Sequence, residues 1–170
     1  MKILGKEKLN KKLAAIPKVA RAMMRKALET SAAEIADTAR SLAPFQSGDL
    51  RNSIGYTFGE YKAENANVRG VASRVGGDPD LSVTIHAGDA KAWYAALVEF
   101  GTGPHNVAKG GGTVTGRLAT AAGLRAAVRH PGAAAQPFFF PAWRLGKKRA
   151  TRRISTAINK AAKQVAAGGR

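Results

Sequence analysis

The chain has 170 residues and no cysteine, and its 28 Lys plus Arg against 11 Asp plus Glu give a formal net charge of +17. A chain of this length can bury the core of one compact domain without a disulfide or a metal. The lack of cysteine excludes disulfides, thiolate metal sites and cysteine nucleophiles, and the charge indicates a polyanionic neighbour.

The first element in the chain is a basic N-terminal extension, residues 1–17. Its leucines lie among lysines and predict a short amphipathic helix that Pro17 interrupts or restarts. The segment has no apolar run followed by a small-residue cleavage site, and no stretch of the chain reaches the roughly 18 apolar residues of a membrane span. We therefore expect a protein that is not exported by a signal peptide and has no membrane partner.

Residues 18–146 are predicted to form an α+β core. A long helix is expected from Lys18 to Leu42, because apolar residues recur mostly every three, four or seven positions and proline bounds both ends. Two strand candidates follow, Gly55–Tyr61 and Leu81–Ala87, and the second alternates apolar and polar side chains. The predicted fold is a long N-terminal helix packed on a small, mostly antiparallel sheet, with a C-terminal helix.

Three further segments of the core are less regular. Glu64–Asp80 is polar and rich in turn residues, which indicates a hairpin-type excursion or a loop. Ala92–Phe100 fits a short helix or a buried strand equally well. Residues 103–135 are predicted to form a long loop, because glycine and alanine dominate them, with Leu118–Arg129 as a candidate helix inside it.

The end of the chain carries the greatest excess of positive charge. Residues 143–170 hold nine basic side chains and no acidic one. Pro141 is expected to open a last helix, and residues 147–170 are predicted to be a basic helix or tail. Its densest group of charges, here called the basic cluster, consists of Lys147, Lys148, Arg149, Arg152 and Arg153.

The basic cluster has two open interpretations. It is either a solvated helix face, or a surface that contacts DNA in a channel or an acidic partner ring. The charge is not gathered on one recognition element beside base-reading Asn or Gln side chains. Any contact with DNA is therefore expected to be directed at phosphates and independent of sequence.

No catalytic or metal-binding constellation is recognisable. His86, His105 and His130 are scattered, and no cysteine completes a zinc site. The glycines at 110–112 are not followed by the Lys of a phosphate-binding loop, and no nucleophile motif occurs. We expect no enzyme activity, no metal and no cofactor.

Three segments follow one another in an order that is more specific than any of them alone. They are Ala43–Ile54 (APFQSGDLRNSI), Trp93–His105 (WYAALVEFGTGPH) and Gln136–Ala142 (QPFFFPA). In this order they resemble the phage family of gene-ten-product-like tail-completion proteins. Ser47 stands where that family usually has Thr.

The resemblance implies a virion structural protein. It implies an α+β subunit that assembles as a ring of six copies, either in the phage neck or at the head-proximal end of the tail. The expected partners are the other copies, tail tube, tail terminator or head connector proteins, and passing double-stranded DNA. The implied location is the virion, and the host cytoplasm during assembly. The alternative is a free basic nucleic-acid-binding protein.

Five residues of the second and third segments are candidates for the subunit interface. Glu99 lies between apolar residues, so its carboxylate is expected to be solvated at an edge or paired with Arg or Lys. Three consecutive phenylalanines cannot all face one small core if the segment is extended, so either at least one meets another subunit or the long helix and the loop together bury all three. The candidates are Glu99, Phe100, Phe138, Phe139 and Phe140.

Overall fold

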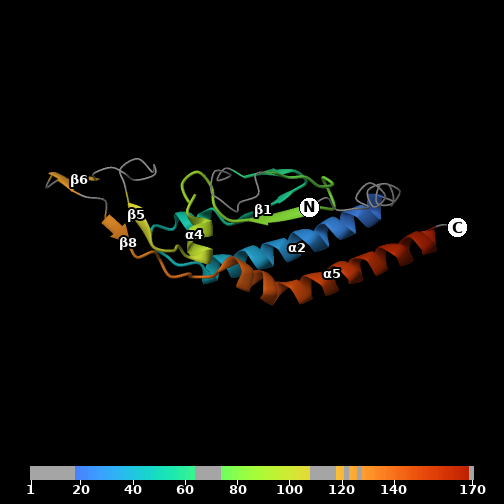
Figure 1. Cartoon of the computed structure of the whole chain (residues 1–170). Helices are drawn as coiled ribbons and strands as arrows, with labels where there is room; N and C mark the ends of the chain where they lie inside the picture. The colour runs from blue at the N-terminus through green and yellow to red at the C-terminus, as the bar shows by residue number, and fades with distance from the viewer. Residues whose placement is uncertain (1–17, 64–73, 108–117, 121–122, 126–127, 169–170) are drawn as a thin grey trace.

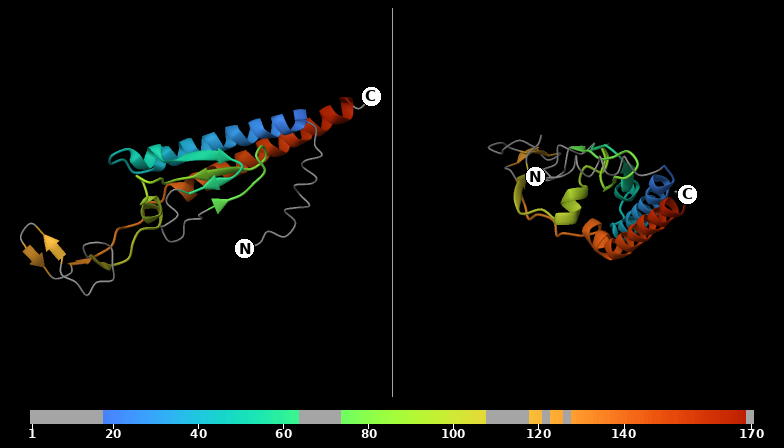
Figure 2. Two further views of the ribbon diagram at one scale, coloured as in Figure 1. Left: turned by 90° about the horizontal axis from the view of Figure 1, so that it is seen from above. Right: turned by 90° about the vertical axis from the view of Figure 1, so that its right-hand side faces the viewer.

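Two long antiparallel helices dominate the structure. The computed structural model describes residues 18–63, 74–107, 118–120, 123–125 and 128–168, so the predicted extension at 1–17 lies outside the described residues. Helix α2 (Lys18–Leu42) lies beside helix α5 (Phe139–Gly168), and short strands cover one side of the pair (Figures 1 and 2). The predicted α+β fold is confirmed.

The strands that pack on α2 form a small antiparallel sheet. Strand β1 (Gly55–Phe58) pairs with β4 (Val83–His86), which places Tyr56 opposite Ile85. The strand predicted at Gly55–Tyr61 ends early because the chain turns at Gly59, whose φ of +73° favours glycine. Beyond that turn, β2 (Tyr61–Lys62) pairs with β3 (Arg74–Val75), so the excursion after β2 is of the hairpin type.

Two short helices complete the body. Helix α3 (Asp49–Asn52) follows the corner after α2, and α4 (Ala95–Phe100) settles the ambiguous segment Ala92–Phe100 as helical at its end. The core lies where these helices meet α2, α5 and the sheet. Its buried residues are Ala36, Ala39, Ala43, Leu50, Ile54, Ala92, Ala95, Phe138 and Ala142.

Small side chains let α2 and α5 approach closely. The buried residues of α5 are alanines, and most of the buried residues of α2, which packs against it, are alanines too. A Cβ atom added at Gly146 would lie 2.4 Å from Cγ1 of Ile35, far inside normal contact. Helix α5 starts at Phe139, two residues before the expected Pro141, and runs unbroken past residues 146 and 147, where a domain boundary is predicted.

The described parts of residues 103–135 form β-ribbons, here called the arm, that project beyond the body (Figures 1 and 2). Strand β5 (His105–Val107) pairs with β8 (Val128–His130), and β6 (Leu118–Thr120) pairs with β7 (Gly123–Arg125). The helix predicted at Leu118–Arg129 is therefore wrong. Alanine favours helix by only a fraction of a kcal/mol per residue, so the hydrogen bonds of strand pairing override it, and Gly123 disfavours a helix.

Candidate functional site

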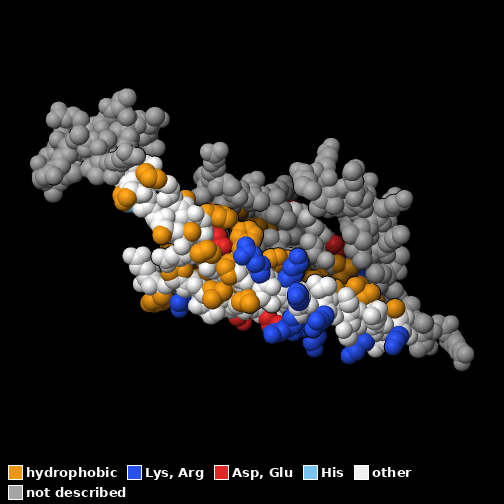
Figure 3. Space-filling view, turned by 60° about the horizontal axis from the view of Figure 1, so that its bottom comes forward, with side chains coloured by type: hydrophobic (Ala, Val, Ile, Leu, Met, Phe, Trp, Pro, Cys, Tyr) orange, Lys and Arg blue, Asp and Glu red, His pale blue; other side chains and the backbone are white. Residues whose placement is uncertain are grey.

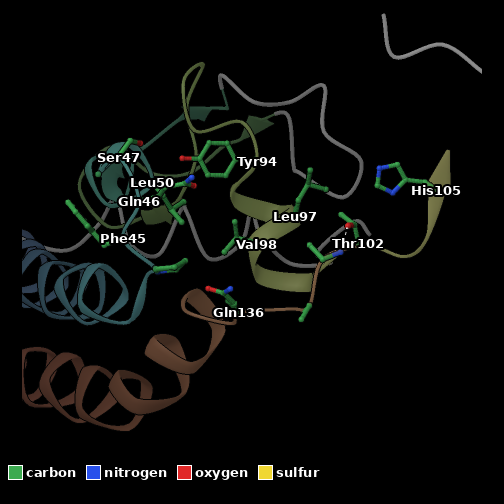
Figure 4. A pocket seen from close by; sticks show the side chains of 14 residues that line it. Phe45, Gln46, Ser47, Leu50, Tyr94, Leu97, Val98, Thr102, His105 and Gln136 are labelled. Carbon is green, nitrogen blue, oxygen red and sulfur yellow. Dashed lines mark hydrogen bonds between the residues drawn. The ribbon is translucent and has the colours of Figure 1, made fainter. Parts of the chain in front are cut away.

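The three ordered segments meet at one end of the body, although long stretches of sequence separate them. Together they line most of an open pocket of about 590 Å³. Figure 4 shows Phe45 and Leu50 of the first segment, Tyr94 and Val98 of the second and Gln136 of the third around it. The segments that carry the family resemblance are thus one structural unit.

The first segment forms the corner that ends α2. The Arg51 guanidinium donates hydrogen bonds of 3.0 and 2.8 Å to the Ala43 carbonyl, one of the last carbonyls that a helix leaves without a partner. Gly48 precedes α3 with φ +91°, which a side chain would strain. Leu50 and Ile54 are buried in the core. These residues shape the corner and leave Phe45 exposed.

Glu99 joins the second segment to the third. Its carboxylate is only 6% exposed and accepts hydrogen bonds from the backbone N–H groups of Phe138, Phe139 and Phe140, at 2.7, 2.8 and 3.1 Å. The expected solvation or pairing with Arg or Lys is therefore wrong among the described residues. The negative charge lies instead at the positive end of the α5 dipole.

The start of α5 has a complete set of backbone partners. A helix begins with four N–H groups that lack intrahelical acceptors. Here Glu99 accepts three N–H groups, Pro141 has none to donate, and the N–H of Ala142 reaches the Phe138 carbonyl at 3.3 Å. Glu99 therefore fixes both the position and the direction of α5.

The candidate phenylalanines divide between the core and the surface. Phe138 is buried and Phe139 is half-buried, whereas Phe100 is 67% and Phe140 44% exposed. The rings of Phe100 and Phe140 contact each other, with centroids 5.8 Å apart. These two exposed rings, here called the aromatic pair, form a surface patch beside Glu99. Their part in a subunit interface stays a prediction.

The basic cluster also divides. Arg153 is half-buried and donates hydrogen bonds of 2.6 and 3.1 Å to the carboxylate of Glu34 on α2, and one of 3.0 Å to Ser31. These hydrogen bonds from Arg153 lower the pKa of Glu34 below its ordinary value. From sequence alone, Arg153 falls in the basic cluster with the solvated charges. Its partner Glu34 lies far away in the sequence, so their contact could not be predicted from sequence.

The remaining basic residues of α5 lie on its outward face. Figure 3 shows Lys and Arg side chains gathered along one face of the body. Arg149 approaches Glu34 at 3.7 Å but is mostly exposed. The exposed basic residues of this face, here called the basic face, are Arg144, Lys147, Lys148, Arg149, Arg152, Lys160 and Lys163.

Acidic side chains of the same chain are largely engaged elsewhere. Arg21 binds Asp78 and Arg25 binds Asp80, which ties α2 to the loop before β4. Burial raises the pKa of Asp78, but hydrogen bonds from the Asp80 N–H and from Arg21 outweigh this and lower it overall. Apart from Arg149, the residues of the basic face form no ion pair with an acidic side chain among the described residues.

No other chemical centre is visible in the part of the chain that the structure describes. His105 and His130 lie side by side at the base of the arm, with ring centroids 5.1 Å apart. Among the described residues, no three His, Asp or Glu side chains gather in a group that could hold a metal ion. None of the described helices is long and apolar enough to cross a membrane.

Comparison with known protein families gives one match. Residues 7–101, more than half of the chain, match the family described as "Bacteriophage HK97-gp10, putative tail-component". The matched range includes α2, the first segment and the second segment as far as Gly101. No curated protein and no solved structure gives a significant match.

Proposed function

The chain belongs to the HK97 gp10-like family of bacteriophage tail components, and from this membership we propose that it is a non-enzymatic structural subunit of a ring in the virion. The ring contains six copies and lies in the neck or at the head-proximal end of the tail. It completes the tail, joins it to the head and leaves a channel for DNA. Tail tube, tail terminator or head connector proteins are its neighbours.

The observation that carries this proposal is the aromatic pair. Two large rings, Phe100 and Phe140, contact each other on the surface instead of entering the core. Exposed apolar patches on a folded subunit mark interaction sites, and aromatic residues are common anchors in them. Glu99 accepts a hydrogen bond from the N–H of Phe140, which fixes the backbone of one ring before a neighbouring subunit binds. Less conformational entropy is then lost on binding.

The basic face supports contact with DNA in the channel. Its side chains extend from one helix, α5, and they are exposed. Contacts of this kind bind phosphates regardless of base sequence, and they are individually weak enough to let DNA slide. A free protein that binds single-stranded nucleic acid is less well supported, because it needs aromatic rings interleaved with the charges. The aromatic residues of α5 lie in its first two turns, before most of the basic face.

Particle assembly with a Phe100→Ser variant tests the ring. This change removes one ring of the aromatic pair while leaving the buried residues in place. We expect a folded protein, checked by circular dichroism, and a loss of at least tenfold in complete particles counted by electron microscopy. Leu145→Ser is the matched control, because Leu145 is 70% exposed on α5 and belongs to neither the aromatic pair nor the pocket.

A wild-type number of complete particles with Phe100→Ser would contradict the proposed contact. An equal loss with Leu145→Ser would also contradict it, because the defect would then follow from any polar change on the surface.

A further inference from the structure

An apolar groove lies on the body between the sheet and the two long helices. Its volume is about 570 Å³. Helix α2 supplies Leu28 and Ile35, β4 supplies Val83 and Ile85, and α5 supplies Trp143 and Ile154. The groove is separate from the pocket where the three segments meet, since the two have no lining residue in common.

The groove exposes apolar side chains that a binding partner could bury. Trp143 is 42% exposed, and the alternating apolar residues of β4 that the sequence assigned to a buried face are only half-buried. Water against so much aliphatic and aromatic surface is unfavourable, and burying it releases free energy in proportion to its area. Trp is also the residue type most often found to anchor a protein interface.

The rim of the groove along α5 is positively charged. Lys147 follows Trp143 by one helical turn, so the two side chains emerge on the same side of α5. Arg144 lies beside them in sequence and is also exposed. Figure 3 shows Lys and Arg side chains directly beside the apolar surface on this face. An occupant must therefore bring apolar side chains together with negative charge.

A second copy of the chain does not meet this requirement. Each copy carries a formal +17. Among the described acidic side chains, Glu34, Asp37, Asp78 and Asp80 form ion pairs within the subunit and Glu99 is buried at the start of α5, while the exposed Glu29 is far outnumbered by basic side chains. A copy docked in the groove would set its unbalanced basic charge against Lys147 and Arg144, which is unfavourable at short range.

We propose that the groove binds an acidic amphipathic segment of a different virion protein. Apolar side chains of that segment cover Trp143, Ile154 and Val83, and its carboxylates pair with Lys147 and Arg144. The inference rests on the proposed function only in naming a virion protein as the partner. It gives the subunit a second interface that adjoins the proposed contact between copies, since Phe140 of the aromatic pair also lines the groove.

Two peptides of matched apolar pattern test the proposal on the full chain. One has the sequence of residues 1–17, a basic amphipathic segment with five lysines, and the other carries Glu at those five positions. Each is labelled, and its binding is followed by fluorescence anisotropy at low and high salt. We expect the Glu peptide to bind at least tenfold more tightly, with the difference shrinking as salt screens the charges.

Single substitutions then locate the binding. Trp143→Ser should weaken binding of the Glu peptide at least tenfold, and Lys147→Glu should reverse the preference toward the lysine peptide. Lys160→Glu is the control, because Lys160 lies on the same helix but does not line the groove. It lowers the net charge equally, so any change in affinity that it causes measures the general electrostatic effect alone. Circular dichroism checks the fold of each variant.

Three results would overturn the proposal. They are failure of the Glu peptide to bind, equal binding of both peptides, and binding that Trp143→Ser leaves intact. Tighter binding of the lysine peptide would show that the groove takes the chain's own N-terminal segment. None of these results depends on Phe100, so they leave the ring proposal to its own test.

Discussion

At the scale of single residues, Glu99 links helix α4 to the start of helix α5. It connects α4 with backbone groups 39 to 41 positions later in the chain. Hydrogen bonds to a charged group are stronger than neutral ones, and a buried N–H without an acceptor is costly. A residue that looked like an interface or ion-pair candidate is therefore a helix-capping residue.

Replacing Glu99 by Ala should destabilise the fold by about 1–3 kcal/mol, since three N–H groups at the start of α5 lose their acceptor. Glu99→Gln should cost less, because its amide oxygen still accepts. Urea unfolding followed by circular dichroism measures both. Equal stability of Glu99→Ala and wild type would show that α5 does not need this cap.

Gly146 allows α2 and α5 to approach closely, which no sequence pattern predicts. In an exposed helix, Gly→Ala stabilises by about 0.5–1 kcal/mol. Here the new methyl group would meet Ile35 at 2.4 Å. We expect Gly146→Ala to destabilise by about 1–3 kcal/mol, as overpacking does.

A double-mutant cycle separates the two effects. Ile35→Ala removes the atoms that the methyl group meets, since the next nearest, Cβ of Ile35, is 3.7 Å away. In that background Gly146→Ala should be neutral or stabilising. Purely additive free energies of unfolding would contradict the close approach of the two helices.

At the scale of elements, the ion pair between Arg153 and Glu34 links α2 to α5 and has a pH dependence of known sign. The pKa of Glu34 is lowered from its ordinary value of 4.5. The folded state therefore binds fewer protons than the unfolded state between the two pKa values. The contribution to stability is complete above pH 4.5 and is lost as the pH falls through the lowered pKa.

We expect this acid-side loss of stability to be smaller in Glu34→Gln than in wild type. Thermal unfolding at a series of pH values from 7 down to about 3 measures the difference between the two curves. Parallel curves over that range would mean that Glu34 contributes nothing to the pH dependence.

The basic cluster should respond unequally to neutralisation. A variant with Gln at the four exposed members, Lys147, Lys148, Arg149 and Arg152, should keep wild-type stability, because solvated charges contribute little. It should reduce the yield of DNA-filled particles. Arg153→Gln should instead lower stability while the other four charges remain. A folded fourfold variant with a normal yield of filled particles would show that the cluster is only a solvated face.

Elements with a strong local period could be predicted from sequence. Helix α2 and strand β4 fall where the apolar spacing placed them. Strand pairing at Leu118–Arg129 could not be predicted from local sequence. Strand β8 pairs with β5, and β6 pairs with β7, whereas the alanines by themselves favour a helix. The same holds for Arg153, whose partner Glu34 lies 119 positions away.

At the scale of the whole molecule, the subunit presents three adjoining surfaces, since Phe140 also lines the groove and Lys147 of the basic face lies on its rim. They are the aromatic pair at the end where the three segments meet, the basic face of α5, and the groove between β4 and α5. A ring needs a contact between unlike patches that closes after a fixed number of copies. A subunit that carries several surfaces of different chemistry has the unlike patches that such a ring requires.

The candidate site could be predicted only in part. The order of the three segments indicated the family that the comparison confirms. The exposure of Phe100 and Phe140 could not be predicted, because it depends on how α4 and the start of α5 pack in the fold. The groove was also unpredictable, because its walls come from three elements that meet only in the fold.

The most direct test of the account is a cryo-electron microscopy reconstruction of the neck and upper tail of particles that contain this chain. We predict one ring of six copies in the neck or at the head-proximal end of the tail, with Phe100 and Phe140 at the contact between copies and the basic face of α5 toward the DNA channel. Absence of the chain from the finished particle, or a ring whose channel is lined by another surface, would contradict the account.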